Sequence, residues 1–229
     1  MTLTLSDSGS YDVGSPASAS ITIADNDPPD TTITSGPATP AASDTAQFSF
    51  AGSEPVSALA GFECALDGAV FTGCVSPVSY SGLGEGVHLF TVRAVDQAGH
   101  VDPTPAVFTW TVDLAGPSIT LNASVVSLWP ANGKLVPDTI TGRVTDALAG
   151  VDPTTVTFTV TDEYGQVQPA GAVSLGADGQ FSFVILLEAS RLGADHDGRR
   201  YVIAVSAADA VGHGGSASIV VVVPHDAPR

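Results

Sequence analysis

The fold is decided by the stretch Val92-Arg93-Ala94-Val95-Asp96-Gln97-Ala98-Gly99-His100, which returns later in the chain as Val205-Ser206-Ala207-Ala208-Asp209-Ala210-Val211-Gly212-His213. Both stretches fit the pattern V-x-A-x-D-x-x-G-H. In each, alternating residues indicate a strand that runs into a turn. An aspartate at the head of a turn accepts hydrogen bonds from backbone N–H groups, and a glycine supplies a positive φ. The pattern is therefore structural first, and its repetition indicates two domains of one kind.

Charge and hydropathy exclude two classes of partner. Among the 229 residues, 24 are acidic and 7 are lysine or arginine, which gives a formal net charge of −17. A surface of this charge repels nucleic acids and anionic membranes. No apolar run approaches the roughly 18 residues of a membrane-spanning helix, so we expect no membrane insertion. Thirteen acidic residues against Arg93 alone lie in residues 1–113, which makes the first half the better candidate for binding cations.

The first 27 residues contain two short alternating runs, at residues 2–5 and 19–23. The opening of the chain carries no positive charge, so it is not a secretory signal. Two strands cannot build a core of their own, because a lone hairpin is marginally stable in water. We therefore expect residues 1–27 to be the C-terminal remnant of a domain whose front lies outside this chain.

The segments Tyr11-Asp12-Val13-Gly14-Ser15-Pro16 and Ala19-Ser20-Ile21-Thr22-Ile23-Ala24-Asp25-Asn26-Asp27 resemble the last two strands of a Calx-beta domain. The resemblance covers only the closing part of such a domain, and it implies that the acidic cluster Asp25, Asn26 and Asp27 helps to bind calcium. Two carboxylates and an amide are also the hard oxygen ligands that calcium prefers. The alternative interpretation is an Asx-rich turn that simply ends a strand.

The second unit, residues 28–114, shows short runs separated by glycine and proline, without sustained helical periodicity. We expect a hairpin turn at Asp67-Gly68, Trp110 in the core, and strands at residues 46–50, 62–66, 70–71, 89–95 and 107–112. Short strands at this density are typical of an immunoglobulin-like sandwich. The unit resembles a bacterial Ig-like repeat of secreted and surface proteins, through Phe62, Cys64, Leu66, Asp67, Gly68, Phe71, Cys74, residues 93–105 and residues 109–113.

The two cysteines, Cys64 and Cys74, flank the expected hairpin. A zinc site needs about four ligands, and no cysteine or paired histidine lies nearby in the sequence. A reactive thiol needs basic neighbours, whereas Glu63 and Asp67 raise a thiol pKa. A disulfide remains, and it implies an oxidising compartment. A strict two-residue turn would place Cys64 opposite Phe71, so we expect the returning strand to bend or bulge.

The third unit, residues 115–229, carries the second copy of the repeat. We expect strands at residues 139–145, 155–161, 180–187, 201–207 and 218–223. The unit resembles another bacterial Ig-like variety, through Leu128-Trp129-Pro130, Asn132-Gly133-Lys134-Leu135-Val136-Pro137, Asp197-Gly198-Arg199-Arg200-Tyr201 and Val223-Pro224-His225-Asp226.

Catalytic signatures are absent from the sequence: it contains neither a phosphate-binding loop nor Gly-x-Ser-x-Gly nor His-Glu-x-x-His. The loop Asp195-His196-Asp197 offers either a base or a metal ligand, but we interpret it as a solvated loop tip with local ion pairs. Arg143 and Arg199 are each interpreted as a surface residue that forms an ion pair. Turn capping is the expected role of Asp96, Asp102 and Asp113, although a second cation cluster of these three is an alternative. The other histidines stand singly near turns, at positions 88, 100, 213 and 225.

These observations predict an all-β chain of tandem immunoglobulin-like sandwiches preceded by an incomplete Calx-beta hairpin. We expect a non-catalytic structural or adhesive spacer of a larger bacterial protein, located outside the cell or on its surface and stiffened by calcium. Its partners would be neighbouring domains of the parent protein and a cell-surface protein or glycan. The alternative is an accessory carbohydrate-binding module of a secreted glycan-degrading enzyme.

Overall fold

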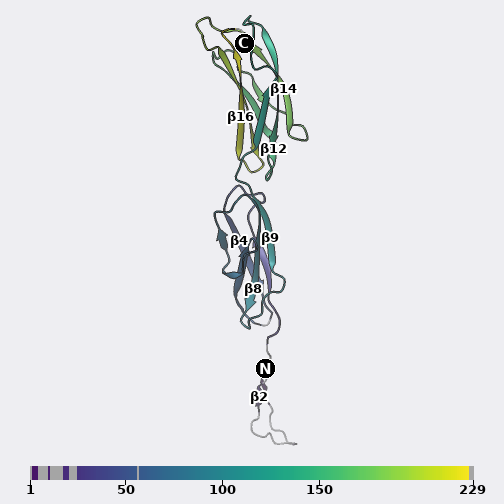
Figure 1. Cartoon of the computed structure of the whole chain (residues 1–229). Coiled ribbons are helices and arrows are strands. Elements are labelled where there is room, and N and C mark those ends of the chain that lie inside the picture. The colour runs from purple at the N-terminus through teal and green to yellow at the C-terminus, as the bar shows by residue number, and fades with distance from the viewer. Residues whose placement is uncertain (1, 5–9, 11–17, 21–24, 56, 227–229) are drawn as a thin grey trace. The chain divides into compact units, whose positions relative to one another are not determined.

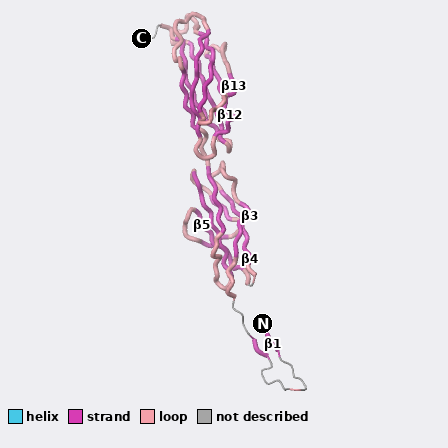
Figure 2. Tube along the Cα trace, turned by 90° about the vertical axis from the view of Figure 1, so that its right-hand side faces the viewer, coloured by secondary structure: helices cyan, strands magenta, loops and turns pink. Residues whose placement is uncertain are grey.

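A computed structural model describes all residues except 1, 5–9, 11–17, 21–24, 56 and 227–229. The described residues contain strands and loops and no helix (Figures 1 and 2), so none of them forms a helix able to cross a membrane. The chain divides into two compact units, one of Met1–Gly36, Gln47–Ser79 and Leu89–Thr109, the other of Pro37–Ala46, Tyr80–His88 and Trp110–Arg229. The domain boundaries expected from the sequence stay a prediction.

A first sandwich is built from two antiparallel sheets. The three-stranded sheet has the order β3 (Asp30–Ser35), β4 (Ala46–Ser53) and β7 (Val78–Tyr80). The four-stranded sheet has the order β6 (Thr72–Cys74), β5 (Leu59–Leu66), β8 (Gly86–Asp96) and β9 (Ala106–Val112). The side chains that alternate inward from β4 and β8 make its core, where the rings of Phe48 and Phe90 stack 4.1 Å apart. Trp110 is buried there, as expected.

A second sandwich repeats this topology strand for strand. Its three-stranded sheet has the order β10 (Ser118–Ala123), β11 (Leu135–Thr145) and β14 (Gln180–Glu188). Its four-stranded sheet has the order β13 (Ala170–Ala172), β12 (Val151–Asp162), β15 (Arg199–Asp209) and β16 (Gly214–Val223). The all-β class and the pair of immunoglobulin-like sandwiches are thereby confirmed.

The first and last segments of each sandwich run in the same direction. In the first, Ala41 forms a parallel bridge to Val112; in the second, Ser127 forms one to Val222. Two parallel terminal segments start at the same end of a sandwich, so the chain enters each sandwich at one end and leaves it at the other. Short parallel pairing also covers part of the last strand, which would otherwise be an open sheet edge.

Near the N-terminus, β1 (Thr2–Thr4) pairs antiparallel with β2 (Ser18–Ser20). The pairing agrees with the expected hairpin. The second strand was expected to extend to residue 23, but residues 21–24 lie outside the described part of the chain.

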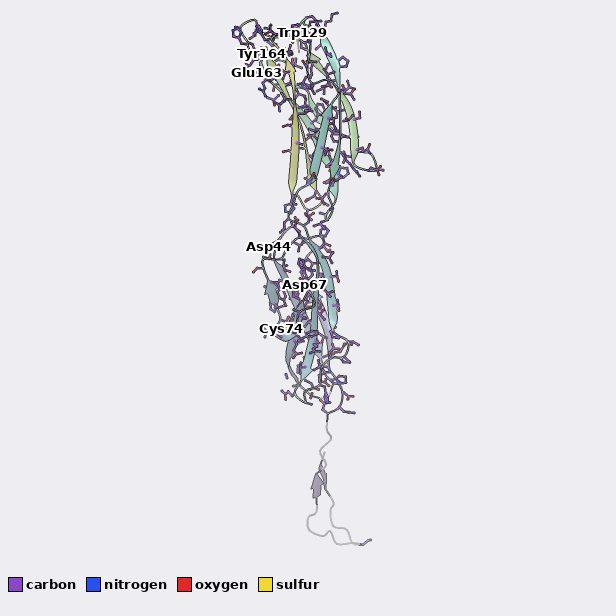
Figure 3. The ribbon with its side chains drawn as sticks, in the orientation of Figure 1. Asp44, Asp67, Cys74, Trp129, Glu163 and Tyr164 are labelled. Atoms are coloured by element: carbon purple, nitrogen blue, oxygen red, sulfur yellow. A yellow bond between two sulfur atoms is a disulfide. The ribbon has the colours of Figure 1, made fainter. Side chains whose placement is uncertain are left out.

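The hairpin between β5 and β6 contains the disulfide. Asp67 and Gly68 both have positive φ, as a tight two-residue turn requires. A strict turn would pair Cys64 with Phe71, but Cys64 lies opposite Thr72, which confirms an extra residue in the returning strand. The expected strand at residues 70–71 is wrong for this reason, since pairing starts only at Thr72. Cys64 and Cys74 then lie diagonally across the ladder, with Cα atoms 5.8 Å apart, and are joined by a disulfide. Cys74 is labelled in Figure 3.

Candidate functional site: two aspartate–histidine clusters

The repeated motif forms the turn between the last two strands of each sandwich. In the second sandwich, Asp209 Oδ1 accepts hydrogen bonds from the backbone N–H groups of Val211, Gly212 and His213, at 2.9, 2.6 and 2.8 Å. Gly212 has φ +98°, which a residue with a side chain rarely adopts. The expected capping role of the aspartate is confirmed.

Each capping aspartate also pairs with the histidine that ends the motif. Asp96 Oδ2 lies 2.9 Å from His100 Nδ1, and Asp209 Oδ2 lies 3.2 Å from His213 Nδ1. Neither aspartate side chain has exposed surface. Burial raises the pKa of Asp96, but the hydrogen bonds from His100 outweigh it and leave the pKa below its usual value. Burial also raises the pKa of Asp209, but the hydrogen bonds from the backbone outweigh it and leave this pKa below its usual value.

A third residue joins each pair from a distant part of the chain. Ligand atoms of Asp25, Asp96 and His100 lie within 4.8 Å of one another, and so do those of Asp113, Asp209 and His213. Asp25 precedes β3 by the same number of residues as Asp113 precedes β10. The residues of the first cluster all lie in one compact unit, and those of the second cluster all lie in the other. The same constellation therefore stands at the start of each sandwich.

The structure separates the three residues that the sequence offered as a calcium site. Asp25 is half-buried and belongs to the first cluster, whereas Asn26 and Asp27 are exposed and lie outside it. Asp25 Oδ1 accepts a hydrogen bond from the backbone N–H of Asp27 at 3.2 Å, which is an Asx turn. Asp25 can take part in both the turn and the cluster, because its carboxylate has two oxygens.

The alternative cluster of Asp96, Asp102 and Asp113 is wrong. Asp96 belongs to the first cluster and Asp113 to the second. Asp102 instead caps a turn, where its Oδ1 accepts from the backbone N–H and the hydroxyl of Thr104, at 2.7 and 3.0 Å. Sequence spacing could not separate these residues, because their positions depend on which end of a sandwich each strand reaches.

Each cluster offers carboxylate oxygens together with one imidazole nitrogen. Carboxylates are hard ligands suited to calcium, which takes about six to eight oxygens. Two aspartates supply at most four of them, so water and backbone carbonyls would have to complete the sphere. In the second cluster, both carboxylate oxygens of Asp113 already accept hydrogen bonds. The donors are the backbone N–H groups of Ala115 and Ala149, at 3.2 and 2.8 Å.

A separate charged network lies at the other end of the second sandwich, which carries Trp129, Glu163 and Tyr164 (Figure 3). Arg199 was expected at the surface, but its side chain has no exposed area. It binds Asp162 through two nitrogens and also reaches Glu188 and Ser190. The surface interpretation of Arg199 is therefore wrong: the residue begins β15, so its side chain follows the inward alternation of that strand.

In the loop Asp195-His196-Asp197, the structure gives the Asp195 side chain partners other than His196. Asp195 accepts hydrogen bonds from the Tyr164 hydroxyl and from the backbone N–H of Gly198. His196 and Asp197 are exposed. The side chain of Asp195 thus holds the loop to the sandwich rather than orienting the neighbouring imidazole.

A cleft of about 630 Å³ lies on the outer face of the sheet β10–β11–β14. Hydroxyl and amide side chains, two glycines and one aromatic ring line it together with one cation, and its lining contains no carboxylate: Thr120, Asn122, Thr141, Gly142, Arg143, Ser174, Gly176, Gln180, Phe181 and Ser182. Arg143 Nε donates to the backbone oxygen of Asp178 at 2.8 Å. The sequence suggested an ion pair for Arg143, whereas in the described part of the chain its guanidinium bonds to this carbonyl group.

No protein-family model matches the chain, and no curated protein sequence matches it. Solved structures that it resembles include the fibronectin(III)-like modules of Clostridium thermocellum CbhA, at 17% identity over 85% of this chain and 94% of that one (TM-score 0.36). A 1.5-MDa bacterial ice-binding adhesin is similar at 16% identity over 79% and 56% (TM-score 0.44). Carbohydrate-binding modules of the β-sandwich superfamily are similar at 13% identity over 90% and 88% (TM-score 0.35). At these identities the likeness concerns the β-sandwich fold alone.

Proposed function

We propose that this chain is a non-catalytic spacer of a larger secreted or surface-bound bacterial protein, in which it holds neighbouring parts of that protein apart. The observation that carries the proposal is the parallel arrangement of the first and last segments in each sandwich. A module that the chain enters at one end and leaves at the other adds its full length to a chain of modules. With an 11-residue strand such as β8, each sandwich adds about 35 Å.

Calcium would stiffen the start of each sandwich. The first site uses Asp25 with Asp96, and Asn26 and Asp27 lie beside it; the second uses Asp113 with Asp209. Carboxylates gathered in this way repel one another, and a bound cation relieves the repulsion. The incomplete ligand sets imply weak binding, near the millimolar range of extracellular modules.

Small-angle X-ray scattering tests the spacer function. The expected result is a maximum dimension of at least about 70 Å, from two sandwiches of about 35 Å each. A chain folded back to the size of a single compact globule would contradict it.

Calorimetry tests the calcium sites separately. Asp25→Asn combined with Asp27→Asn, and Asp113→Asn alone, should each reduce the calcium heat, whereas Asp44→Asn at an exposed position should leave it unchanged. Equal calcium heats in the parent chain and the three variants would contradict the calcium sites. The spacer function would still be tested by the scattering experiment.

A second candidate function is glycan binding, and the polar cleft around Arg143 favours it. Hydroxyl, amide and guanidinium groups match the alternating donors and acceptors of a sugar. Neutral and uronic-acid oligosaccharides titrated onto the chain should lose binding with Arg143→Ala and keep it with Lys134→Ala, which removes an exposed charge elsewhere. Binding that survives Arg143→Ala, or none in the parent chain, would contradict a role for this cleft.

A further inference from the structure

His196 and His225 lie beside each other at the end of the second sandwich where the chain leaves it. Their ring centroids are 5.4 Å apart, with the planes tilted by 44°. His196 comes from the loop between β14 and β15, and His225 follows β16. Two imidazoles that share a tetrahedral metal ion, with bonds of about 2.0–2.1 Å, have ring centroids about 5 Å apart. The observed centroid separation of 5.4 Å is close to that value.

Asp226 orients one of the two rings. Its Oδ1 lies 3.1 Å from His225 Nδ1, so the carboxylate accepts the proton on that nitrogen. The lone pair then belongs to Nε2, which is the usual arrangement of a carboxylate–histidine–metal relay. Such a carboxylate fixes the tautomer of the ligand and makes the imidazole more basic.

Both segments are held in place by other contacts. Arg191 donates to the backbone oxygens of Pro224 and His225, at 3.2 and 2.9 Å. The loop with His196 is held by Asp195, which accepts from Gly198 and from the Tyr164 hydroxyl. A metal ion would therefore not have to order either backbone, and binding loses less conformational entropy as a result.

The local charges also favour a cation. His196 stands between two aspartates in the sequence, and Asp226 follows His225. These three carboxylates oppose the guanidinium of Arg191, which is the cation bonded to this segment. The buried charge of Arg199 is already balanced by Asp162 and Glu188.

We propose that His196 and His225 bind one divalent ion of the borderline class, such as zinc, with Asp226 as a positioning residue and water in the remaining positions. Imidazole nitrogen suits zinc, copper and nickel, whereas calcium prefers oxygen. The ion would tie the loop after β14 to the segment after β16, and so brace the point at which the chain leaves the sandwich. This site is distinct from both aspartate–histidine clusters and does not depend on the spacer function.

Isothermal titration with zinc in excess calcium tests the site, because calcium occupies carboxylate sites and does not compete for imidazole. We expect one zinc ion to bind per chain. His196→Gln and His225→Gln should each weaken binding by at least about tenfold, and Asp226→Asn by about tenfold. His88→Gln removes an imidazole elsewhere and should leave binding unchanged.

Zinc binding that persists in the double variant His196→Gln/His225→Gln, or an absence of zinc binding by the parent chain, would overturn the proposal. Nuclear magnetic resonance of the parent chain gives a readout that needs no substitution. Zinc should shift the ring signals of His196 and His225 together, at equal zinc concentrations, and leave those of His88 in place. Ring shifts confined to His100 or His213 would assign the ion to the clusters instead.

Discussion

Arg199 and Asp162 form a two-pronged ion pair in which neither side chain has any exposed surface. Arg199 Nε lies 2.9 Å from Asp162 Oδ1, and Nη2 lies 2.6 Å from Oδ2. Asp162 also accepts from the backbone N–H groups of Tyr164, Gln166 and Val167. Because nearly every charge-bearing atom has a partner, the pair avoids the large cost of burying a charge alone.

The first prediction concerns the loss of one partner. Arg199→Met leaves the Asp162 carboxylate buried and without its counter-charge, which should reduce the free energy of unfolding of the second sandwich by about 3–5 kcal/mol. Arg200→Met, at the exposed neighbouring position, should change it by less than about 0.5 kcal/mol. Urea denaturation measures both. An equal change in the free energy of unfolding for the two substitutions would contradict a stabilising role of the Arg199–Asp162 pair.

The second prediction concerns pH. Burial raises the pKa of Asp162, but the hydrogen bonds from Arg199 and the backbone outweigh it and hold the pKa well below its usual range. A carboxylate whose pKa is lowered on folding contributes stability that is complete above its unfolded pKa of about 3.9 and is lost as the pH falls below it. The stability difference between the parent chain and Asp162→Asn should therefore be constant above about pH 5 and shrink below pH 4. A difference that stays constant down to pH 2 would contradict this assignment.

The third prediction concerns the disulfide between Cys64 and Cys74. Closing this short loop should stabilise the first sandwich by about 2–3 kcal/mol in the chain-entropy interpretation. Reduction should therefore lower the melting temperature of the first sandwich and leave that of the second unchanged. In differential scanning calorimetry the double variant Cys64→Ser/Cys74→Ser should show the lowered value with or without reductant. A parent melting curve indifferent to reductant would count against a stabilising role.

The fourth prediction concerns Gly142 in β11, where a Cβ atom would overlap the carbonyl oxygen of Thr120 and press on the ring of Phe181. Gly142→Ala should destabilise the second sandwich by about 1–3 kcal/mol, because neither the backbone of β10 nor the packed ring can give way freely. Gly214→Ala, where nothing lies within 4 Å of the added Cβ, is the matched control and should cost less. Thermal unfolding separates them, and an equal shift would show that β10 moves without penalty.

Short-range features were predictable from the sequence. The turn at Asp67-Gly68, the shift in the returning strand and the capping role of Asp96 and Asp209 all involve residues close to one another along the chain. Their chemistry is settled by backbone conformation and by side chains that reach their own turn. The strands were also predictable, because alternation of inward and outward residues follows directly from strand geometry.

Strand length was predicted less well than strand existence. The expected strand at residues 201–207 starts at Arg199, and the expected strand at residues 139–145 starts at Leu135. Both extensions contain polar, charged or proline residues that pattern alone assigns to loops. These residues are part of the strands because they form hydrogen bonds to neighbouring strands. Which strands are neighbours is known only from the assembled sheet.

The sequence by itself determined the all-β class, the repeated turn, the cysteine pair and the formal net charge of −17. Only the tertiary structure decided that Asp25 meets Asp96 and His100, that Arg199 is buried against Asp162, and that His196 lies beside His225. Each of these contacts joins residues far apart in the chain. Because the sandwich places strand ends from different parts of the sequence at a common end, topology determines which polar side chains meet, and no local pattern encodes it.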